Sequence, residues 1–295
     1  MLLKLFKYDF KNVAKIGLPI SLVMLLTSGL AAVFWWFISI AFETENEMLA
    51  DTIMVVALFM MFTWVIALVV YSIGIKFLVV YRYYTHFFTD QGYLTFTLPC
   101  KTSSHFKSKI LNGLLWDLIS SVVVVCCVGI VLLALPSDIN FGERIWEAFS
   151  LYTMFDNNML MTPEIQVIQK VIELVFTSIS ELMILYIAVT IGAMVANRHK
   201  ILASIGFYLA ISWTFSLIET LATIIPKFTM LANYDYYMFE AYNPGITSDW
   251  FEQYQRMYNT AGWITTGITL GLHLAAIVVF YLLNRRFLNK KLNLA

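Results

Sequence analysis

The sequence predicts an all-α integral membrane protein with six transmembrane helices and both termini in the cytoplasm. Hydrophobic residues make up 60% of the 295 residues and charged residues only 13%, a composition too apolar for an ordinary soluble domain. A spanning helix needs about 20 mostly apolar residues, because each adds about 1.5 Å across about 30 Å of hydrocarbon. Six stretches meet this requirement, so residues 1–295 are expected to form a single transmembrane domain. The stretches lie at roughly 16–42, 50–80, 110–135, 166–196, 201–225 and 260–284.

The formal net charge is +0, yet Lys and Arg are unevenly distributed along the chain. If the N-terminus lies inside, 15 of the 19 Lys and Arg residues fall on the inner side and 4 on the outer side. Lys and Arg in short loops accumulate on the cytoplasmic side of membranes. This bias predicts the orientation of the six spans. The four outer residues are Arg144, Lys170, Lys227 and Arg256.

Residues 1–15 have the pattern of an amphipathic helix. At about 100° per residue, four lysines fall within an arc of roughly 80° and apolar side chains cover the opposite side. Such a helix lies in the membrane interface, with its lysines toward anionic head groups of the bilayer. Asp9 interrupts the apolar side of this helix. The alternative interpretation is that residues 1–15 are only a positively charged flank of the first span. The lysines are Lys4, Lys7, Lys11 and Lys15, and the apolar residues are Leu2, Phe6, Phe10 and Val13.

The motifs of several enzyme classes are missing from the sequence. None of the 13 glycines opens a G-x-x-x-x-G-K-[ST] loop, none of the 4 histidines belongs to an H-E-x-x-H, and no serine lies in a G-x-S-x-G. Cys126 and Cys127 lie within a span and Cys100 faces the cytosol, so neither a disulfide nor a metal site is expected. We therefore expect no catalytic residue, no cofactor and no nucleic-acid partner for this chain.

Residues 82–108 form the one sizeable segment predicted between spans on the cytosolic side. Gly92 and Pro99 break regular structure, and Phe87, Phe88 and Tyr93 add aromatic side chains beside them. Exposed aromatic side chains at such density mark a protein contact. An ordered loop without a partner is the alternative.

The chain resembles permease subunits of bacterial ABC transporters, in the export branch called type two. The resemblance rests on six spans with both ends inside, an amphipathic N-terminal helix and a long outer loop at 226–259. Its most specific part is Phe-Thr-Asp-Gln-Gly-Tyr-Leu-Thr-Phe-Thr-Leu-Pro, from Phe88 to Pro99. In that family the first cytosolic loop carries a coupling helix that sits in a cleft of a separate ATPase subunit. The resemblance assigns this role to Phe87, Phe88, Thr89, Asp90, Gly92, Tyr93 and Leu94.

The resemblance also implies partners, location and mechanism. Two permease chains, identical or related, would pair in the bacterial cytoplasmic membrane above two ATPase subunits, which bind the ATP and magnesium. The expected activity is export of an amphipathic or peptide-like compound. A non-transporting membrane partner, such as an immunity, sensor or assembly subunit, is the alternative from a different class. A secondary transporter is disfavoured, because broken helices with paired ionisable sites are not evident.

Four acidic residues fall within or beside the predicted spans: Asp117, Glu173, Glu181 and Glu219. Asp117 and Glu219 lie near span ends and are expected at the interface, while Glu181 is the deep one. His273, about 18 Å inside Arg285, is the basic residue near the midplane. We therefore expect a contact between Glu181 and His273, which would either line a path or hold two spans together.

The sixth span carries small residues at a spacing of four. Gly267, Gly271 and Ala275 lie on one helix face, where they allow another backbone to approach closely. The neighbour could belong to this chain or to a second copy, and packing within the chain is the expectation.

Overall fold

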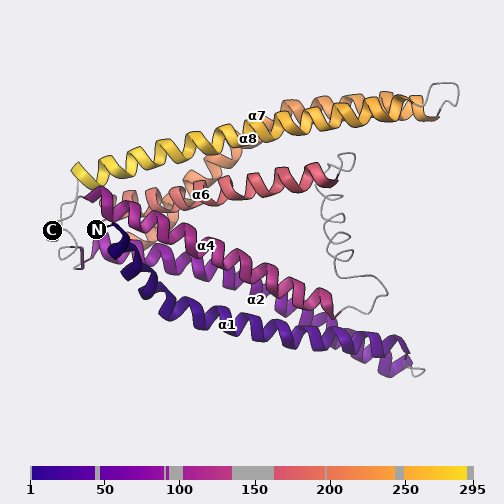
Figure 1. Cartoon of the computed structure of the whole chain (residues 1–295), viewed down its shortest axis with the longest axis horizontal. Coiled ribbons are helices and arrows are strands. Elements are labelled where there is room, and N and C mark those ends of the chain that lie inside the picture. Colours follow the sequence, from indigo (N-terminus) through magenta and orange to yellow (C-terminus); the bar gives the residue numbers. More distant parts are fainter. Residues whose placement is uncertain are drawn as a thin grey trace. The chain divides into compact units, whose positions relative to one another are not determined.

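The computed structural model describes residues 2–43, 47–89, 91–92, 102–134, 163–196, 198–242 and 249–290. The chain divides into two compact units (Figure 1). Unit 1 spans residues 1–148, together with 294–295, and unit 2 spans residues 149–293. Each unit contains three long helices, and the two units are described separately below.

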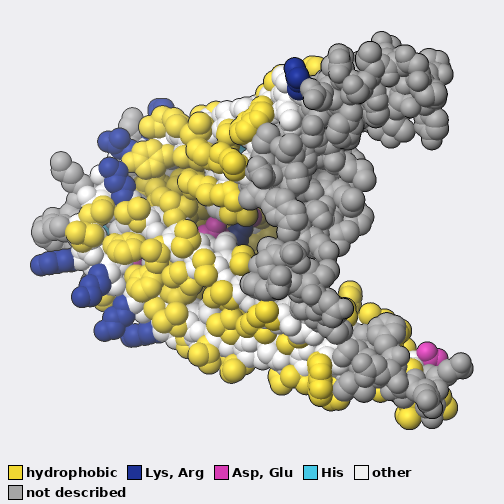
Figure 2. All heavy atoms as spheres, turned by 45° about the vertical axis from the view of Figure 1, so that its right-hand side comes forward, with side chains coloured by type: hydrophobic (Ala, Val, Ile, Leu, Met, Phe, Trp, Pro, Cys, Tyr) yellow, Lys and Arg dark blue, Asp and Glu magenta, His cyan; other side chains and the backbone are white. Residues whose placement is uncertain are grey.

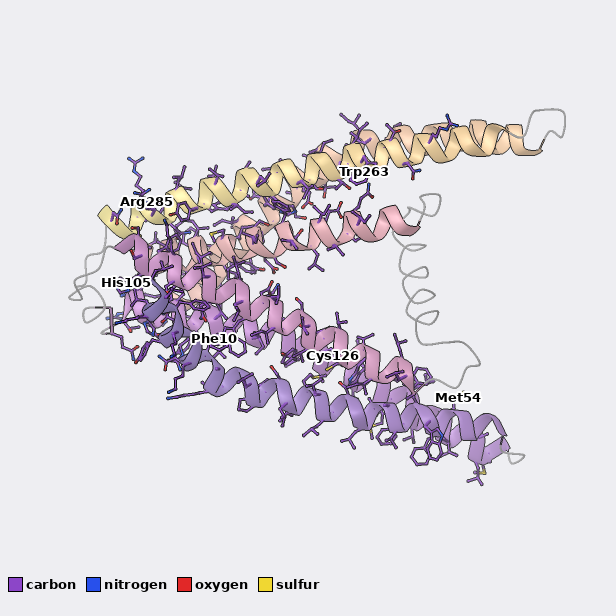
Figure 3. The ribbon with its side chains drawn as sticks, in the orientation of Figure 1. Phe10, Met54, His105, Cys126, Trp263 and Arg285 are labelled. Carbon is purple, nitrogen blue, oxygen red and sulfur yellow. The ribbon has the colours of Figure 1, made fainter. Side chains whose placement is uncertain are left out.

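Unit 1 consists of α1 (Leu2–Glu43), α2 (Glu47–Phe88) and α4 (Thr102–Leu133). Side-chain contacts set their directions. Ser21 of α1 bonds Tyr71 of α2, and Ser28 of α1 bonds Trp64, so these two helices are antiparallel. Along α1, residue 9 bonds residue 109 of α4, the ring of residue 10 stacks on residue 116, and residue 24 bonds residue 127. The contacts advance in the same direction along both helices, so α1 and α4 are parallel. Phe10 and His105 consequently lie at one end of the unit and Met54 at the other (Figure 3).

Unit 2 consists of α6 (Pro163–Val195), α7 (Lys200–Tyr242) and α8 (Asp249–Lys290). Three hydrogen bonds join residues 173, 180 and 190 of α6 to residues 266, 273 and 284 of α8 in a steady register. These two helices are therefore parallel, and α7 runs back in the opposite direction and contacts both. Each unit thus has the same internal order, in which the first and third helices are parallel and the second is antiparallel.

The helix surfaces are apolar along their lengths. Within the described residues, six helices are long and apolar enough to cross a membrane, as the sequence predicts. Large hydrophobic side chains such as Phe62, Val125 and Trp213 are well exposed. On the visible face, yellow apolar side chains cover most of the described surface, and most visible Lys and Arg side chains gather at its left edge (Figure 2). This arrangement suits a multi-pass protein whose apolar surface faces lipid.

The expected boundary after residue 15 is absent from the structure. α1 is continuous from Leu2 to Glu43 and contains Pro19, which cannot donate to the carbonyl of Lys15. The N-terminal third of the helix runs at an angle to the rest (Figure 1), and an internal proline is a recognised cause of such a bend. Lys4, Lys7, Lys11 and Lys15 are exposed on this part of the helix. The opposite side packs partly on α4 instead of facing only lipid, because Phe10 stacks on Trp116 at 5.5 Å.

Two predicted connecting segments are shorter than expected. α2 continues to Phe88 and α4 begins at Thr102, so both ends of the 82–108 segment are extensions of the spans. α7 continues through Pro226 to Tyr242 and α8 begins at Asp249, so most of the predicted 226–259 loop is helical. The spans are longer because aromatic and polar residues can continue a helix beyond the apolar window used to define its membrane part. Most of the connection between α4 and α6 lies outside the described residues.

Candidate functional site

Two places in the described chain gather polar or aromatic side chains inside the helical packing. One is the end of unit 1 where α2 finishes and α4 starts. The other is a layer of polar side chains that joins the three helices of unit 2. We consider them in turn because each contains residues that the sequence singles out.

An aromatic cluster closes the end of unit 1. It consists of Tyr83, Phe87, Phe88 and Phe106. Of these, Tyr83, Phe87 and Phe106 are fully buried or nearly so. The ring of Tyr83 lies 5.1 Å from that of Phe87 and 6.2 Å from that of Phe106. Phe88 is half-buried and stacks on Tyr84. The cluster therefore joins the end of α2 to the start of α4.

A tight turn follows the aromatic cluster. The backbone N–H of Gly92 donates to the carbonyl of Thr89 at 2.7 Å, and Thr89 Oγ1 donates to the carbonyl of Thr85. A Cβ atom at position 92 would lie 2.9 Å from the Phe87 carbonyl oxygen, so only glycine allows this approach. Gly92 is thus explained by the turn itself, whatever else the segment contacts.

Of the positions expected to contact a partner, the structure describes Phe87, Phe88, Thr89 and Gly92. Phe87 was expected to offer its ring to a partner, but the ring is buried inside unit 1 with an exposed fraction of 0%. The reason is that α2 continues to Phe88, about two turns beyond the predicted end of the span at residue 80. Phe87 thereby lies next to Tyr83 and near Phe106. Phe88 and Thr89 are half-buried and retain some exposed surface. Asp90, Tyr93 and Leu94 lie outside the described residues.

A buried ion pair lies in the same end of unit 1. Lys109 Nζ of α4 lies 2.6 Å from Asp9 Oδ1 of α1, and Ser108 Oγ donates to Asp9 Oδ2 at 2.9 Å. Both charged side chains are below 10% exposed, at 7% and 9%. Such charge-assisted bonds are short and strong when water is excluded. The sequence contained a signal for this pair, since an acid on an otherwise apolar helix face requires a partner.

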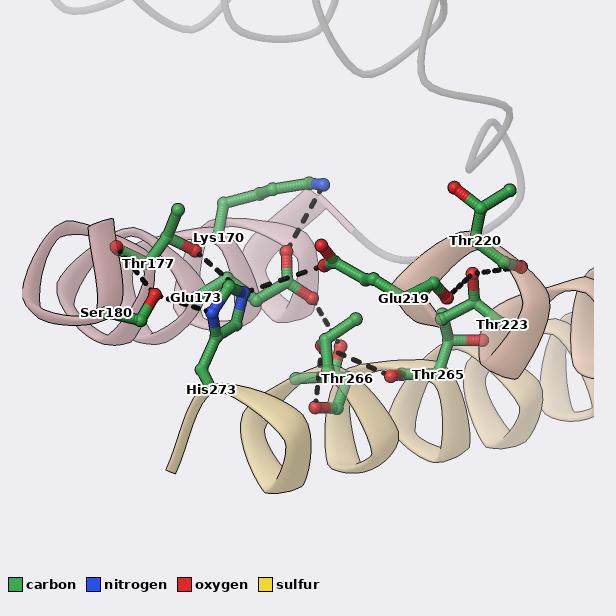
Figure 4. A network of polar contacts seen from close by, with 11 residues as sticks. Lys170, Glu173, Thr177, Ser180, Glu219, Thr220, Thr223, Thr265, Thr266 and His273 are labelled. Carbon is green, nitrogen blue, oxygen red and sulfur yellow. Dashed lines mark hydrogen bonds and ion pairs between the residues drawn. The ribbon is translucent and has the colours of Figure 1, made fainter. Parts of the chain in front are cut away.

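The second candidate is the polar layer of unit 2, shown in Figure 4. We use this name for Lys170, Glu173, Thr177 and Ser180 of α6, Glu219 of α7, and Thr266 and His273 of α8. Glu173, Thr177 and Ser180 are separated by four and three residues along α6, so they lie on one face of the helix. Ionisable side chains within transmembrane helices are rare and usually face the interior of the bundle, so the layer is a functional candidate.

The partner of His273 differs from the expected one. Its Nδ1 lies 2.7 Å from Ser180 Oγ, and its Nε2 lies 3.3 Å from Thr177 Oγ1 and 3.6 Å from Glu219 Oε1 (Figure 4). Glu219 of α7 therefore faces His273 instead of Glu181. Glu181 follows Ser180 on α6 and is turned about 100° away from it around the helix axis. Because α7 continues beyond Pro226, Glu219 lies well inside the helix and not at its end.

The hydrogen bonds of His273 allow either neutral tautomer of the ring. Ser180 has one hydroxyl hydrogen, for which Nδ1 of His273 at 2.7 Å and the carbonyl of Thr177 at 2.9 Å compete. If Ser180 donates to Nδ1, the ring hydrogen lies on Nε2. If Ser180 donates to the Thr177 carbonyl, Nδ1–H donates to Ser180 and Thr177 Oγ1 donates to Nε2.

The two carboxylates of the layer are unequally satisfied. Thr266 Oγ1 donates to Glu173 Oε1 at 2.9 Å, and Lys170 Nζ lies 3.4 Å from Glu173 Oε2. The only contact of the Glu219 carboxylate within the described chain is His273 at 3.6 Å, which is too long for a hydrogen bond. The Glu219 side chain is 32% exposed, whereas that of His273 is 6% exposed. Of the two carboxylates, Glu219 therefore has the weaker set of contacts.

The small residues of α8 face outward from unit 2. No described atom lies within 4 Å of a Cβ built on Gly267 or Gly271. Both glycines and Ala275 are exposed. The expected close packing of this face within the chain is therefore not seen in the described part of unit 2.

The comparisons with known proteins add no family to these observations. No family model, no curated protein and no solved structure matches the chain. The functional argument therefore rests on the residues and contacts of this chain.

Proposed function

We propose that this chain is a permease subunit of an ATP-binding-cassette exporter, driven by a separate ATPase subunit that binds ATP and magnesium. The observation that supports it most is the anchoring of the α2 end, where the aromatic cluster and the Asp9–Lys109 ion pair tie together all three helices of unit 1. Two further observations support the proposal: the resemblance of residues Phe88 to Pro99 to ABC permeases, and the six apolar helices. The proposed cargo is an amphipathic or peptide-like compound.

The anchoring supports the proposal for a mechanical reason. A force applied to a loop moves the membrane helices only if the loop is rigidly connected to them. Buried aromatic rings and a desolvated ion pair resist deformation, because moving them would open cavities or separate paired charges. A partner that pressed on the segment after α2 would therefore move α1, α2 and α4 together. ATP does such work by binding one global state better than the other.

The buried position of Phe87 narrows the proposed docking surface. The surface starts at Phe88 and Thr89, and the proposal includes Asp90, Tyr93 and Leu94 beyond them. Phe87 and Gly92 instead hold the end of α2 and the following turn in place. In the full assembly we place a second permease chain, identical or related, in the bacterial cytoplasmic membrane, with both termini and the 82–108 segment inside the cell.

Co-purification tests the proposal directly. The tagged chain is extracted in mild detergent from the cells that produce it, and its complexes are weighed by native mass spectrometry and assayed for ATP hydrolysis. We expect an ATP-hydrolysing subunit to accompany the wild type and to be lost from a Phe88→Ala/Tyr93→Ala variant. Phe62→Ala is the matched control, because Phe62 is 65% exposed on the same helix but lies within its apolar part.

The outcomes separate the two functional classes. Loss of the ATPase with Phe88→Ala/Tyr93→Ala, but not with Phe62→Ala, supports both the permease and the docking surface. A wild-type chain that runs alone, or with a protein that does not hydrolyse ATP, removes the transporter proposal and favours the non-transporting membrane partner. Equal ATPase recovery from all three proteins would move the docking surface elsewhere.

A further inference from the structure

Two histidines lie beside permanent cations at the end of unit 1 where α2 finishes and α4 starts. Arg82 and His86 are four residues apart on α2. His105 and Lys109 have the same spacing on α4. Residues at this spacing are neighbours on one face of a helix. The aromatic cluster packs α2 against α4 at this level, and His86 lies within electrostatic range of the other three side chains. The two pairs therefore meet at one junction between the helices.

The junction has a single carboxylate for these basic groups. The charged groups that face the histidines are Asp9 from α1, Arg82 from α2 and Lys109 from α4. The oxygens of Asp9 already bond Lys109 and Ser108. With both imidazoles neutral, two cations and one carboxylate leave a formal charge of +1, and protonation of both imidazoles raises it to +3. Each added proton therefore introduces a charge without a free counter-ion among these groups.

His105 is poorly placed to carry a second ring proton. Its side chain is 5% exposed, and its Nε2 is buried without a hydrogen-bond partner among the described residues. A neutral imidazole can leave this nitrogen as an acceptor, whereas an imidazolium has an N–H donor at both nitrogens. Protonation would leave a charged donor unpaired next to the ammonium group of Lys109. Both effects cost more away from water than in it.

We propose that His86 and His105 form a pH-sensitive junction, which holds the end of α2 against α4 while both imidazoles are neutral and releases it when they are protonated. The repulsion acts between the helices because one histidine belongs to α2 and the other to α4. The docking surface proposed at Phe88 and Thr89 follows His86 directly, so acid would weaken its anchoring. In this last step the inference rests on the proposed permease function.

The direction of the pH effect follows from proton linkage. In a released junction both imidazoles are in water, where they bind a proton near about pH 6.5. Below that pH the released state binds more protons than the packed state, so acid shifts the equilibrium toward release. The packed junction is therefore stable above about pH 6.5 and loses stability as the pH falls below it. For one such histidine, a change from about pH 7.5 to about pH 5.5 raises the released population about tenfold, if the packed state binds no proton.

Hydrogen exchange of the chain by itself tests the proposal. The full chain is placed in nanodiscs of zwitterionic lipid, and amide exchange is followed by mass spectrometry at these two pH values, with the intrinsic effect of pH on exchange divided out. We expect protection of residues 82–89 and 102–109 to fall about tenfold or more in acid. Residues 205–217 of α7 belong to unit 2 and should keep their protection. This comparison uses only the wild type, so it does not depend on any variant folding.

Variants then assign the effect to the two histidines. Glutamine is polar but does not titrate, so His86→Gln/His105→Gln should lose no more than about twofold in protection on acidification. His199→Gln is the matched control, because His199 is exposed just before α7 and its replacement should leave the wild-type response. Tryptophan fluorescence melting at the higher pH confirms that both variants are folded. Unchanged protection in the wild type, an equal loss in both units, or an undiminished loss in His86→Gln/His105→Gln would overturn the proposal.

The assay contains no ATPase, so its failure is distinct from failure of the proposed function. A pH response in a chain without a co-purifying ATPase would keep the junction but remove its role in docking. An ATPase complex whose permease chain shows no pH response would keep the permease and refute the switch.

Discussion

At the residue scale, the Asp9–Lys109 pair shows how a charge inside an apolar helix face is accommodated. The two groups lie 2.6 Å apart, and Ser108 supplies a further donor to the carboxylate. Removing one member of a buried pair is costly because the other charge stays away from water. For Asp9→Asn we therefore expect the free energy of unfolding to fall by about 3 kcal/mol, measured by denaturant titration of the chain in mixed micelles.

A double-mutant cycle provides the control for this prediction. Asp9→Asn/Lys109→Met removes both charges and should recover part of the lost stability, since a buried pair and an apolar replacement are often close in free energy. Asp51→Asn alters an exposed acid of α2 and should change stability by less than about 0.5 kcal/mol. Additive effects of the two single changes at positions 9 and 109 would contradict a direct interaction.

Glycine 192 gives a second prediction at the residue scale. A Cβ at this position in α6 would lie 2.5 Å from the backbone nitrogen and the Cα of Ser204 in α7. Backbone atoms cannot rotate away, so the helices would have to separate. We expect Gly192→Ala to lower the free energy of unfolding by about 2 kcal/mol. Gly206→Ala on α7, where no atom lies within 4 Å, should be neutral or stabilising by up to about 1 kcal/mol.

At the element scale, α6 and α8 are joined by hydrogen bonds that recur along their parallel register. Thr190 Oγ1 donates to Asn284 Oδ1 at 2.8 Å, and Asn284 is fully buried. Bonds between helices in membranes are worth only about 0.6 kcal/mol on average, because partners exist in the unfolded state too. A cycle with Thr190→Val and Asn284→Leu should therefore give a coupling energy near this value. A coupling above about 2 kcal/mol would indicate that this bond is part of a larger cooperative network.

At the scale of the whole molecule, the distribution of Lys and Arg predicts which helix ends face the cytoplasm. In a chain whose three cysteines are replaced by alanine, we expect Asp51→Cys to react with a membrane-impermeant maleimide in intact cells. Lys107→Cys should react only after the membrane is opened. Both positions are exposed in the structure, so a difference in labelling reports the side of the membrane. The reverse pattern would invert the topology.

The helical class and the six apolar helices follow from the sequence alone, because spanning a bilayer requires about 20 apolar residues in a row and leaves few other solutions. The same rule locates the apolar part of a helix but not its ends. It therefore missed the continuation of α2 to Phe88 and of α7 to Tyr242. It also separated residues 1–15, predicted as a helix of their own, from the span with which they form the single helix α1.

Only the tertiary structure decided which side chains meet. From the sequence, Glu181 is the deep acid and His273 the matching base, yet Ser180, Thr177 and Glu219 surround the imidazole. Distance along a helix axis says little about which helix lies opposite, or about which face is turned toward it. Likewise, the sequence alone predicts an exposed Phe87, but the packing of α4 against α2 buries it. Asp9 interrupts an apolar face in the sequence, and only the fold shows that Lys109 pairs with it. Local patterns determine helices, whereas partners depend on packing between segments far apart in the chain.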